Sequence, residues 1–186
     1  MKLEDLKIYI VESNLAGFLN FQDTFKDIKN VEVVNGYIQD FYEDHKNEID
    51  CLVSPANAFG IMTGGYDAAL SDILGWDFQL KVQKYIKDNF YGEQLVGTSF
   101  IIDTDIPGLK LIHTPTMQYP SVIIDDMVIY QCMRATLMCA LENNVNCIVI
   151  PIFGGRCGGV KSEVAAKRMK DAYLQIRDKK EAEFDF

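Results

Sequence analysis

The sequence predicts an α/β fold, a three-layer α/β/α sandwich around a mixed, mainly parallel central sheet. Short apolar and β-branched runs alternate along the 186 residues with segments whose apolar residues recur at helical spacing. The central strand-like runs are continuously apolar, which is typical of parallel strands covered by helices on both faces. At this length we expect a single domain over residues 1–178, followed by an acidic C-terminal tail at 179–186.

Six segments are expected to be strands, because they are short, rich in β-branched or aromatic residues and bounded by turn residues. Gly36 ends the second strand, Pro55 ends the third, and Pro107 with Gly108 links the fourth to the fifth. The last run is the most apolar of the six. The expected strands cover residues 6–11, 31–35, 50–54, 98–102, 109–113 and 146–153.

Helices are expected where apolar residues repeat at intervals of three and four. A cap residue is expected before three of them, namely Asp77, Asp125 or Asp126, and Ser162. Gly75 ends the third helix. The expected helical segments cover residues 14–25, 40–48, 66–74, 78–90, 126–142 and 162–176.

The composition narrows the classes of function. A net charge of −9 argues against a general nucleic-acid binder, which needs clustered Lys and Arg side chains. No stretch approaches the roughly 20 apolar residues of a membrane span, and acids within the first apolar run make a poor signal peptide. Five cysteines without a CxxC pair and only two histidines favour neither disulfides nor a metal site. We therefore expect a cytoplasmic protein without a cofactor.

Two glycine-rich loops each follow a predicted strand and open a predicted helix. They are SPANAFGIMTGGYDAAL, residues 54–70, and FGGRCGGVKS, residues 153–162. Helix N-termini carry unpaired N–H groups and a partial positive charge, and glycine lets the main chain approach an anion closely. Ligands of such sheets lie beyond the carboxyl ends of the strands. Either loop alone is compatible with a simple tight turn, but the pair predicts a groove that holds a diphosphate by main-chain amides.

Two other phosphate motifs fit less well. The stretch from Gly155 to Ser162 is one residue away from a P-loop, because Val160 occupies the place of the second glycine. No further strand-like run follows Ser162, although a P-loop core needs several. A dinucleotide GxGxxG motif does not occur in the sequence.

Several segments together resemble the macro domains, α/β/α modules that bind ADP-ribose. DCLVSPANAFGIMTGGYDAAL is similar to the family's strand, Asn-containing turn and Gly-Gly-Φ-Asp loop, in the Ser-Pro-Ala-Asn form of a microbial and phage subgroup. LIHTPTM resembles its strand ending in a histidine, VIPIFGGRCGGV its second phosphate loop, and VEVVNGYIQDF its early strand. The likeness covers about residues 31–178 and is most specific over 50–70.

The resemblance implies a role for each matching residue. Asn57 matches the asparagine that hydrogen-bonds the distal ribose, and Asp67 matches the acid that positions a water beside the ribose C1″ in hydrolytic members. These two residues are the candidate catalytic residues. Other matches lie beside the adenine, the distal ribose and the diphosphate, and with Asn57 they are the candidate ligand-binding residues: Gly36, Tyr37, Ile38, Gly64, Gly65, Tyr66, Gly154, Gly155, Arg156, Cys157 and Gly158.

Two residues depart from the family's pattern. Tyr37 stands where an aspartate usually contacts the adenine amino group, so adenine is recognised by stacking or by a neighbour such as Asp40, or the base preference is relaxed. Arg156 stands where glycine is common, and it either strengthens the hold on the phosphates or blocks part of the groove.

The remaining candidates have simpler readings. Asp67 would stabilise the helix dipole whether or not it acts on a ligand. His113, at the end of a buried strand, is expected to be structural. Cys157 lies in the second loop, where a helix N-terminus favours a thiolate, but no base is evident beside it.

The resemblance implies a hydrolase without a metal or cofactor, acting at the distal ribose. Either it is an ADP-ribose 1″-phosphate phosphatase (Appr-1″-p processing), or it is a mono-ADP-ribosyl hydrolase with an ADP-ribosylated protein as partner. The alternative is a non-catalytic reader or sequestering module for ADP-ribose or a related nucleotide. A third alternative is an interaction domain that kept the fold and lost the ligand.

Overall fold

A six-stranded sheet lies at the middle of the computed structural model, which describes residues 1–178. The acidic tail expected at 179–186 lies outside the described residues. The strand order is β2-β1-β6-β3-β5-β4, and every neighbouring pair is parallel except β4 and β5. The strands are β1 (Lys7–Glu12), β2 (Val31–Asn35), β3 (Cys51–Ser54), β4 (Phe100–Asp103), β5 (Lys110–His113) and β6 (Cys147–Ile150).

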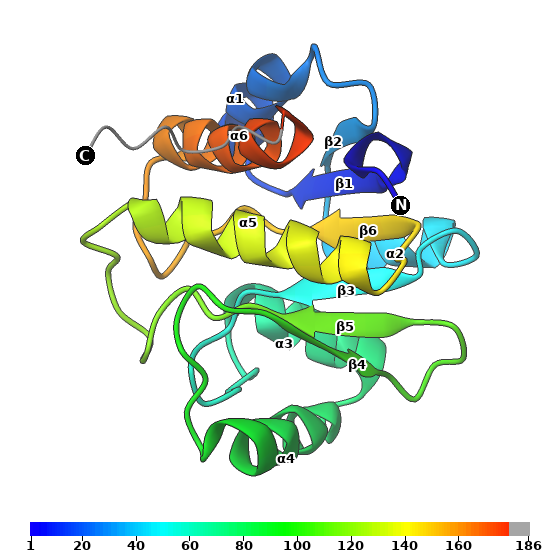
Figure 1. Ribbon diagram of the computed structural model, residues 1–186, viewed down its shortest axis with the longest axis vertical. Helices are drawn as coiled ribbons and strands as arrows, with labels where there is room; N and C mark the ends of the chain where they lie inside the picture. Colours follow the sequence, from blue (N-terminus) through cyan, green and yellow to red (C-terminus); the bar gives the residue numbers. More distant parts are fainter. Residues whose placement is uncertain (179–186) are drawn as a thin grey trace, which may run out of the picture.

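Helices cover both faces of the sheet, as Figure 1 shows, which confirms the predicted three-layer fold. A short 3-10 helix, η1 (Leu3–Asp5), precedes β1. One face packs against α1 (Leu15–Phe25), α5 (Met127–Glu142) and α6 (Ser162–Asp178). The other face packs against α2 (Ile38–His45), α3 (Gly65–Leu74) and α4 (Phe78–Phe90).

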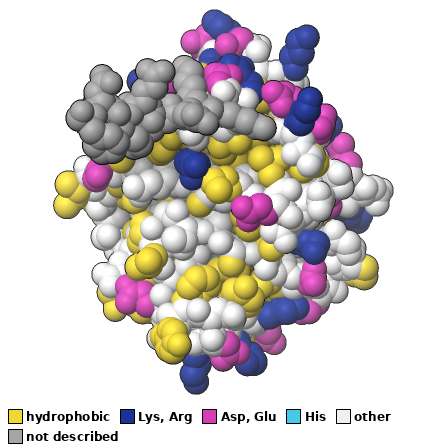
Figure 2. All heavy atoms as spheres, viewed as in Figure 1, with side chains coloured by type: hydrophobic (Ala, Val, Ile, Leu, Met, Phe, Trp, Pro, Cys, Tyr) yellow, Lys and Arg dark blue, Asp and Glu magenta, His cyan; other side chains and the backbone are white. Residues whose placement is uncertain are grey.

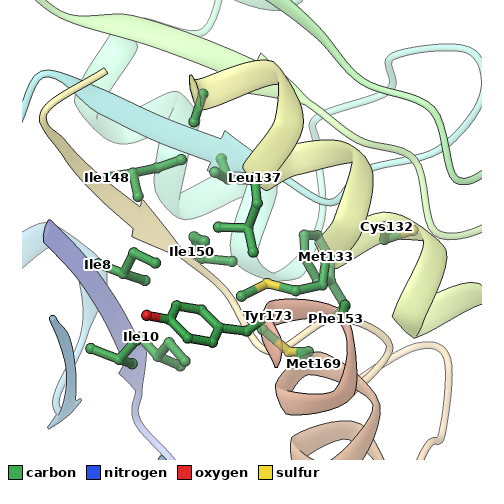
Figure 3. Close-up of a cluster of buried hydrophobic side chains, with 14 of the residues drawn as sticks. Ile8, Ile10, Cys132, Met133, Leu137, Ile148, Ile150, Phe153, Met169 and Tyr173 are labelled. Atoms are coloured by element: carbon green, nitrogen blue, oxygen red, sulfur yellow. The ribbon is translucent and has the colours of Figure 1, made fainter. Parts of the chain in front are cut away.

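The alternation of side chains along each strand divides the interior into two cores. In β1, Ile8 and Ile10 point to the face of α1, α5 and α6, whereas Tyr9 and Val11 point to the opposite face. Burying a side chain of this size contributes about 1.5–3 kcal/mol. Figure 3 shows the first of these cores, with side chains from β1, β6, α5 and α6: Ile8, Ile10, Met133, Leu137, Ile148, Ile150, Met169 and Tyr173.

Several predicted boundaries are shifted by one to three residues, and two of these shifts lie beside the carboxyl edge of the sheet. The last strand ends at Ile150 and not at residue 153, because Pro151 has no N–H to continue the ladder. The second helix covers Ile38–His45, two residues earlier at its start than expected. This shift places Tyr37 at the N-cap of α2.

The predicted caps are only partly formed. Ser162 is the first residue of α6, and its hydroxyl accepts a hydrogen bond from the Asn20 amide at 2.7 Å. Asp77 precedes α4 without a side-chain capping bond. At α5, Asp125 accepts a hydrogen bond from the Met127 N–H at 3.0 Å.

Two features of the surface bear on possible partners: the helices of residues 1–178, and the charges on the face that α5 crosses. Within residues 1–178, none of the helices combines the length and apolar character needed to cross a bilayer. Figure 2 shows Lys and Arg side chains interspersed with Asp and Glu over the described part of the face that α5 crosses. Such mixing gives no concentrated positive field on this face.

Candidate functional site

A groove of about 570 Å³ opens at the carboxyl edge of the sheet. The loops that follow β1, β2, β3, β5 and β6 all contribute to its walls. These loops are distant in sequence, but parallel strands end at the same edge and bring them together. The volume is typical of a site for a small organic ligand.

The first glycine loop leads into α3 at the wall of this groove. Gly64 is the N-cap residue, and Gly65 is the first helical residue, with a φ of 56°. A Cβ atom on either glycine would meet no other heavy atom within 4 Å. The positive φ at Gly65 favours glycine, whereas the space beside Gly64 is open. The first-turn N–H groups of α3, which have no intrahelical acceptor, lie at this opening.

The second glycine loop, residues 153–162, also lines the groove and is tightly packed. Gly154 has a φ of 74°, and a Cβ there would lie 2.5 Å from the Ile129 Cδ1 atom. A Cβ at Gly158 would lie 2.7 Å from the Gly154 carbonyl oxygen. Among the described residues, no protein acceptor is hydrogen-bonded to the N–H groups of 156–158. These amides are therefore available to an anion in the groove.

Asp67, in the first turn of α3, is the buried acid of the groove. Its exposed fraction is 7%, and its Oδ1 accepts a hydrogen bond from the Ser54 hydroxyl at 2.5 Å. Burial raises the pKa of Asp67 to about 7, and the hydrogen bond from Ser54 opposes this rise. A solvated acid that merely complements a helix dipole would keep an ordinary pKa. A carboxyl that exchanges its proton near neutral pH is suited to general acid–base chemistry.

Asn57 braces the turn that follows β3. Its Nδ2 donates to the Ile61 carbonyl at 3.0 Å, and its Oδ1 accepts from the N–H groups of Phe59 and Ile61, each at 3.2 Å. The side chain is buried and lines the groove. One amide N–H remains for a ligand, since the amide carries two donors and only one is used.

Arg156 is held against the loop that follows β1. Its Nη2 donates to the Ser13 hydroxyl at 2.8 Å. The side chain borders both the groove and a second hollow, of about 590 Å³, beside the N-terminus of α1. Glu12 also lines this hollow, and its carboxylate accepts from the Asn14 N–H at 2.6 Å. The Glu12 carboxylate therefore occupies the N-terminus of α1, where an anion would otherwise bind.

The end of the groove near α2 combines an exposed ring with a polar pair. Tyr37 is 65% exposed and lines the groove, so its ring face is accessible to a planar base. Gln39 Nε2 donates to Asp72 Oδ2 at 3.2 Å, and both residues line the same end. Asp40, the neighbour considered from the sequence, is not among the lining residues.

His113 is buried beside Phe100 and behaves as a structural group. Its Nδ1 lies 2.6 Å from Gln94 Oε1, so Nδ1 carries the proton, because that amide oxygen only accepts. Its Nε2 has no partner among the described residues. Burial lowers the pKa of His113 to about 3, so the ring is neutral at physiological pH.

Of the five cysteines, only Cys157 is exposed, and it lines the groove. All five are free thiols in the structure. The residues described contain no cluster of three or more His, Cys, Asp or Glu side chains suited to a metal ion. Besides amides and hydroxyls, the polar groups of the groove include the Arg156 guanidinium, the carboxyls of Glu12 and Asp72, and the buried carboxyl of Asp67.

All of the residues proposed from the sequence as catalytic or ligand-binding line this one groove, whereas His113 and Asp40 do not. Their contacts with a ligand remain predictions. Four other lining residues, Glu12, Ser13, Gln39 and Asp72, were not predicted from the sequence, and neither was Ser54, which is hydrogen-bonded to Asp67. A sequence signal existed for Ser54 alone, because it directly precedes the Pro-Ala-Asn turn.

A protein-family model, the Macro domain, matches residues 53–169. An uncharacterized protein of Aquifex aeolicus is 27% identical over 152 residues, which are 81% of this chain and 84% of the relative. An uncharacterized protein of Aeropyrum pernix is 25% identical over 134 residues, which are 72% of this chain and 68% of the relative.

Similar solved structures are macrodomains. The macrodomain of Mycobacterium tuberculosis DarG has a TM-score of 0.59 at 22% identity, covering 70% of this chain and 85% of its own. A mutant Oceanobacillus iheyensis macrodomain with ADPR has a TM-score of 0.65 at 16% identity, covering 96% of this chain and 82% of its own. At these identities the likeness establishes a shared fold.

Proposed function

Because the chain belongs to the macro domain family, we propose that its groove binds ADP-ribose, or a derivative of it, and hydrolyses the ligand at the distal ribose. Binding is supported by the family match and by the fold shared with macrodomains solved with ADP and with ADPR. It is also supported by the two glycine loops that line the same groove, whose main-chain amides can hold a diphosphate without lysine side chains.

The observation that carries hydrolysis is the state of Asp67. The acid is buried at the groove wall, and its pKa of about 7 lets it act as a base near neutral pH. Activation of Asp67 needs no cation beside it, because its burial already raises its pKa to about 7.

The proposed reaction uses a water placed between Asp67 and the distal ribose. Asp67 takes a proton from this water while the water oxygen bonds to C1″. The bond from C1″ to the leaving oxygen breaks, and the leaving group departs as phosphate or as the carboxylate of a protein side chain. Free amides of the second loop stabilise the negative charge of the diphosphate that anchors the ligand.

One observation favours the alternative of a non-catalytic reader. Asn57, matched by resemblance to the distal ribose, already uses both ends of its amide to brace the turn at 57–61. A ribose held by only one remaining N–H would be less tightly oriented for attack. A reader would use the same glycine loops and would not need the titration of Asp67.

Two measurements on the same protein test the proposal. Calorimetry with ADP-ribose is expected to give a Kd in the micromolar range or below, and ADP-ribose 1″-phosphate is expected to release phosphate with turnover. Binding without release of phosphate, or of ADP-ribose from a mono-ADP-ribosylated protein, would establish the reader instead. No heat of binding with any ADP-ribose derivative would overturn both functions.

A further inference from the structure

Ser54 is a buried hydroxyl at the end of a central strand. It is the last residue of β3, is fully buried, and lies in register with His113 on β5. Alternation along β3 directs its side chain to the face covered by α2, α3 and α4. A hydroxyl in such a place needs a partner, because an unpaired buried polar group is unfavourable.

That partner is Asp67, across the loop that contains the first glycine pair. The Ser54 hydroxyl donates to Asp67 Oδ1 at 2.5 Å, and both residues are buried. Among the described residues no other side chain is hydrogen-bonded to the Asp67 carboxyl, which otherwise accepts from its own main-chain N–H, and the residue reaches the groove wall. The hydrogen bond thus connects the end of β3 to the first turn of α3, and it distinguishes the two carboxylate oxygens.

We infer that Ser54 is a positioning residue for Asp67: its hydroxyl holds Oδ1 within the protein and directs Oδ2 toward the water in the groove. The catalytic meaning of this inference rests on the proposed function. The hydrogen-bond geometry and the burial of both partners carry the positioning itself. A carboxylate fixed at one oxygen presents a single basic site, which is what a water aimed at C1″ requires.

The other titratable groups around Asp67 do not replace this contact. Tyr66, beside it on α3, is a buried phenol whose pKa is raised by burial. His113 on β5 is neutral, because burial lowers its pKa to about 3. Glu12 and Arg156 line the same groove, but neither is among the causes that shift the pKa of Asp67. The hydrogen bond from Ser54 is the main interaction that lowers the pKa of Asp67 against the effect of burial. Without the Ser54 hydroxyl, that pKa would therefore rise further.

The test follows the Asp67 carboxyl in Ser54→Ala by carbon-13 NMR, with the signal assigned by its loss in Asp67→Asn. We expect the pKa of Asp67 to rise by about one unit in Ser54→Ala. With ADP-ribose 1″-phosphate, turnover should fall at both pH 6 and pH 9, because the orientation of the carboxylate is lost at both, and the raised pKa should add a further loss of about tenfold near pH 6 only. ADP-ribose affinity should change by less than about threefold.

Two further variants separate positioning from simple packing. Ser54→Thr keeps the hydroxyl and suits a strand, so it should return both the carboxyl titration and the pH profile toward the parent protein. Thr136 on α5 has an equally buried hydroxyl, which is hydrogen-bonded to Thr114 at 2.9 Å. Thr136→Val removes that hydroxyl and should leave the titration of Asp67 unchanged.

The outcomes distinguish this inference from the proposed function. A carboxyl in Ser54→Ala that titrates as in the parent protein overturns the positioning role, whatever the turnover. A shifted carboxyl in a protein that binds ADP-ribose but never turns over supports the positioning and overturns the hydrolysis. An equal loss of turnover at all pH values, with no shift in titration, would assign Ser54 a structural role only.

Discussion

The two glycine loops look alike in sequence but differ in what their glycines do. In the first loop, a Cβ at Gly64 would enter open space at the groove. In the second loop, a Cβ at Gly154 or Gly158 would collide with Ile129 or with the loop's own backbone. Gly64 therefore leaves room near a buried acid at the start of α3, whereas Gly154 and Gly158 are required by the packing of their loop. Similar motifs can thus carry functional and structural requirements separately.

The largest effect is expected at the acid of the first loop. Asp67→Asn removes the base but keeps the size of the side chain, so turnover of ADP-ribose 1″-phosphate should fall by about 100-fold or more. Affinity for ADP-ribose, measured by calorimetry, should stay within about tenfold. Asp88→Asn, an exposed charge change on α4, should leave turnover as it is. Full turnover in Asp67→Asn would show that the acid of the first loop is not the catalytic base.

The same acid should make stability depend on pH. Folding raises the pKa of Asp67 from an ordinary 3.8 to about 7, so the native state favours the protonated form. Stability from this group is fully present below about pH 4 and is lost as the pH rises through about 7, by about 2–4 kcal/mol in total. Asp67→Asn should therefore gain stability over the parent protein at pH 8 and not at pH 4, in urea unfolding. Equal differences at both pH values would contradict a buried acid with a raised pKa.

The packed glycines of the second loop should tolerate no side chain. Gly158→Ala places a methyl group 2.7 Å from a backbone oxygen, so it should lower the free energy of unfolding by about 2–3 kcal/mol. Gly64→Ala is the matched control in the first loop and should change stability by less than about 1 kcal/mol, because its Cβ meets nothing. Urea titration of both variants checks this. Equal losses would show that the two loops do not differ in packing.

The open glycine should instead control the ligand. Gly64→Val fills part of the groove at the start of α3, so ADP-ribose affinity should fall about tenfold while the protein stays folded. Calorimetry measures the affinity, and circular dichroism measures the fold. Unchanged affinity would place the ligand away from the first loop and would leave the second loop as the main anion site.

Much of the fold could be predicted from local pattern. The periodicity of apolar residues located all six strands and the six α-helices, and a proline explains why β6 stops at Ile150. The contribution of Glu12 and Ser13 to the groove could not be predicted, because it depends on β1 lying between β2 and β6. Strand order is set by packing across the whole sheet, and no short segment encodes it.

The sequence predicted which residues belong to the candidate site, but not which contacts each of them makes. Spacing and resemblance brought Asp67 and both glycine loops into one set, and the groove contains them all. The hydrogen bond from Ser54 to Asp67 depends on how α3 docks against the end of β3, and the lack of space for a Cβ at Gly154 depends on the position of Ile129 in α5. Such contacts appear only once the helices are docked on the sheet.

The second glycine loop is also joined to the segment at 119–124. The Ile123 N–H donates to the Gly158 carbonyl at 2.9 Å, and the Ile123 side chain fills the space where Cβ atoms are missing from Gly154 and Gly158. The neighbouring Val122 and Ile124 are exposed. A ligand that changes the conformation of the second glycine loop would therefore move the segment at 119–124 as well, and deuterium uptake at the Ile123 amide would report that the groove is occupied.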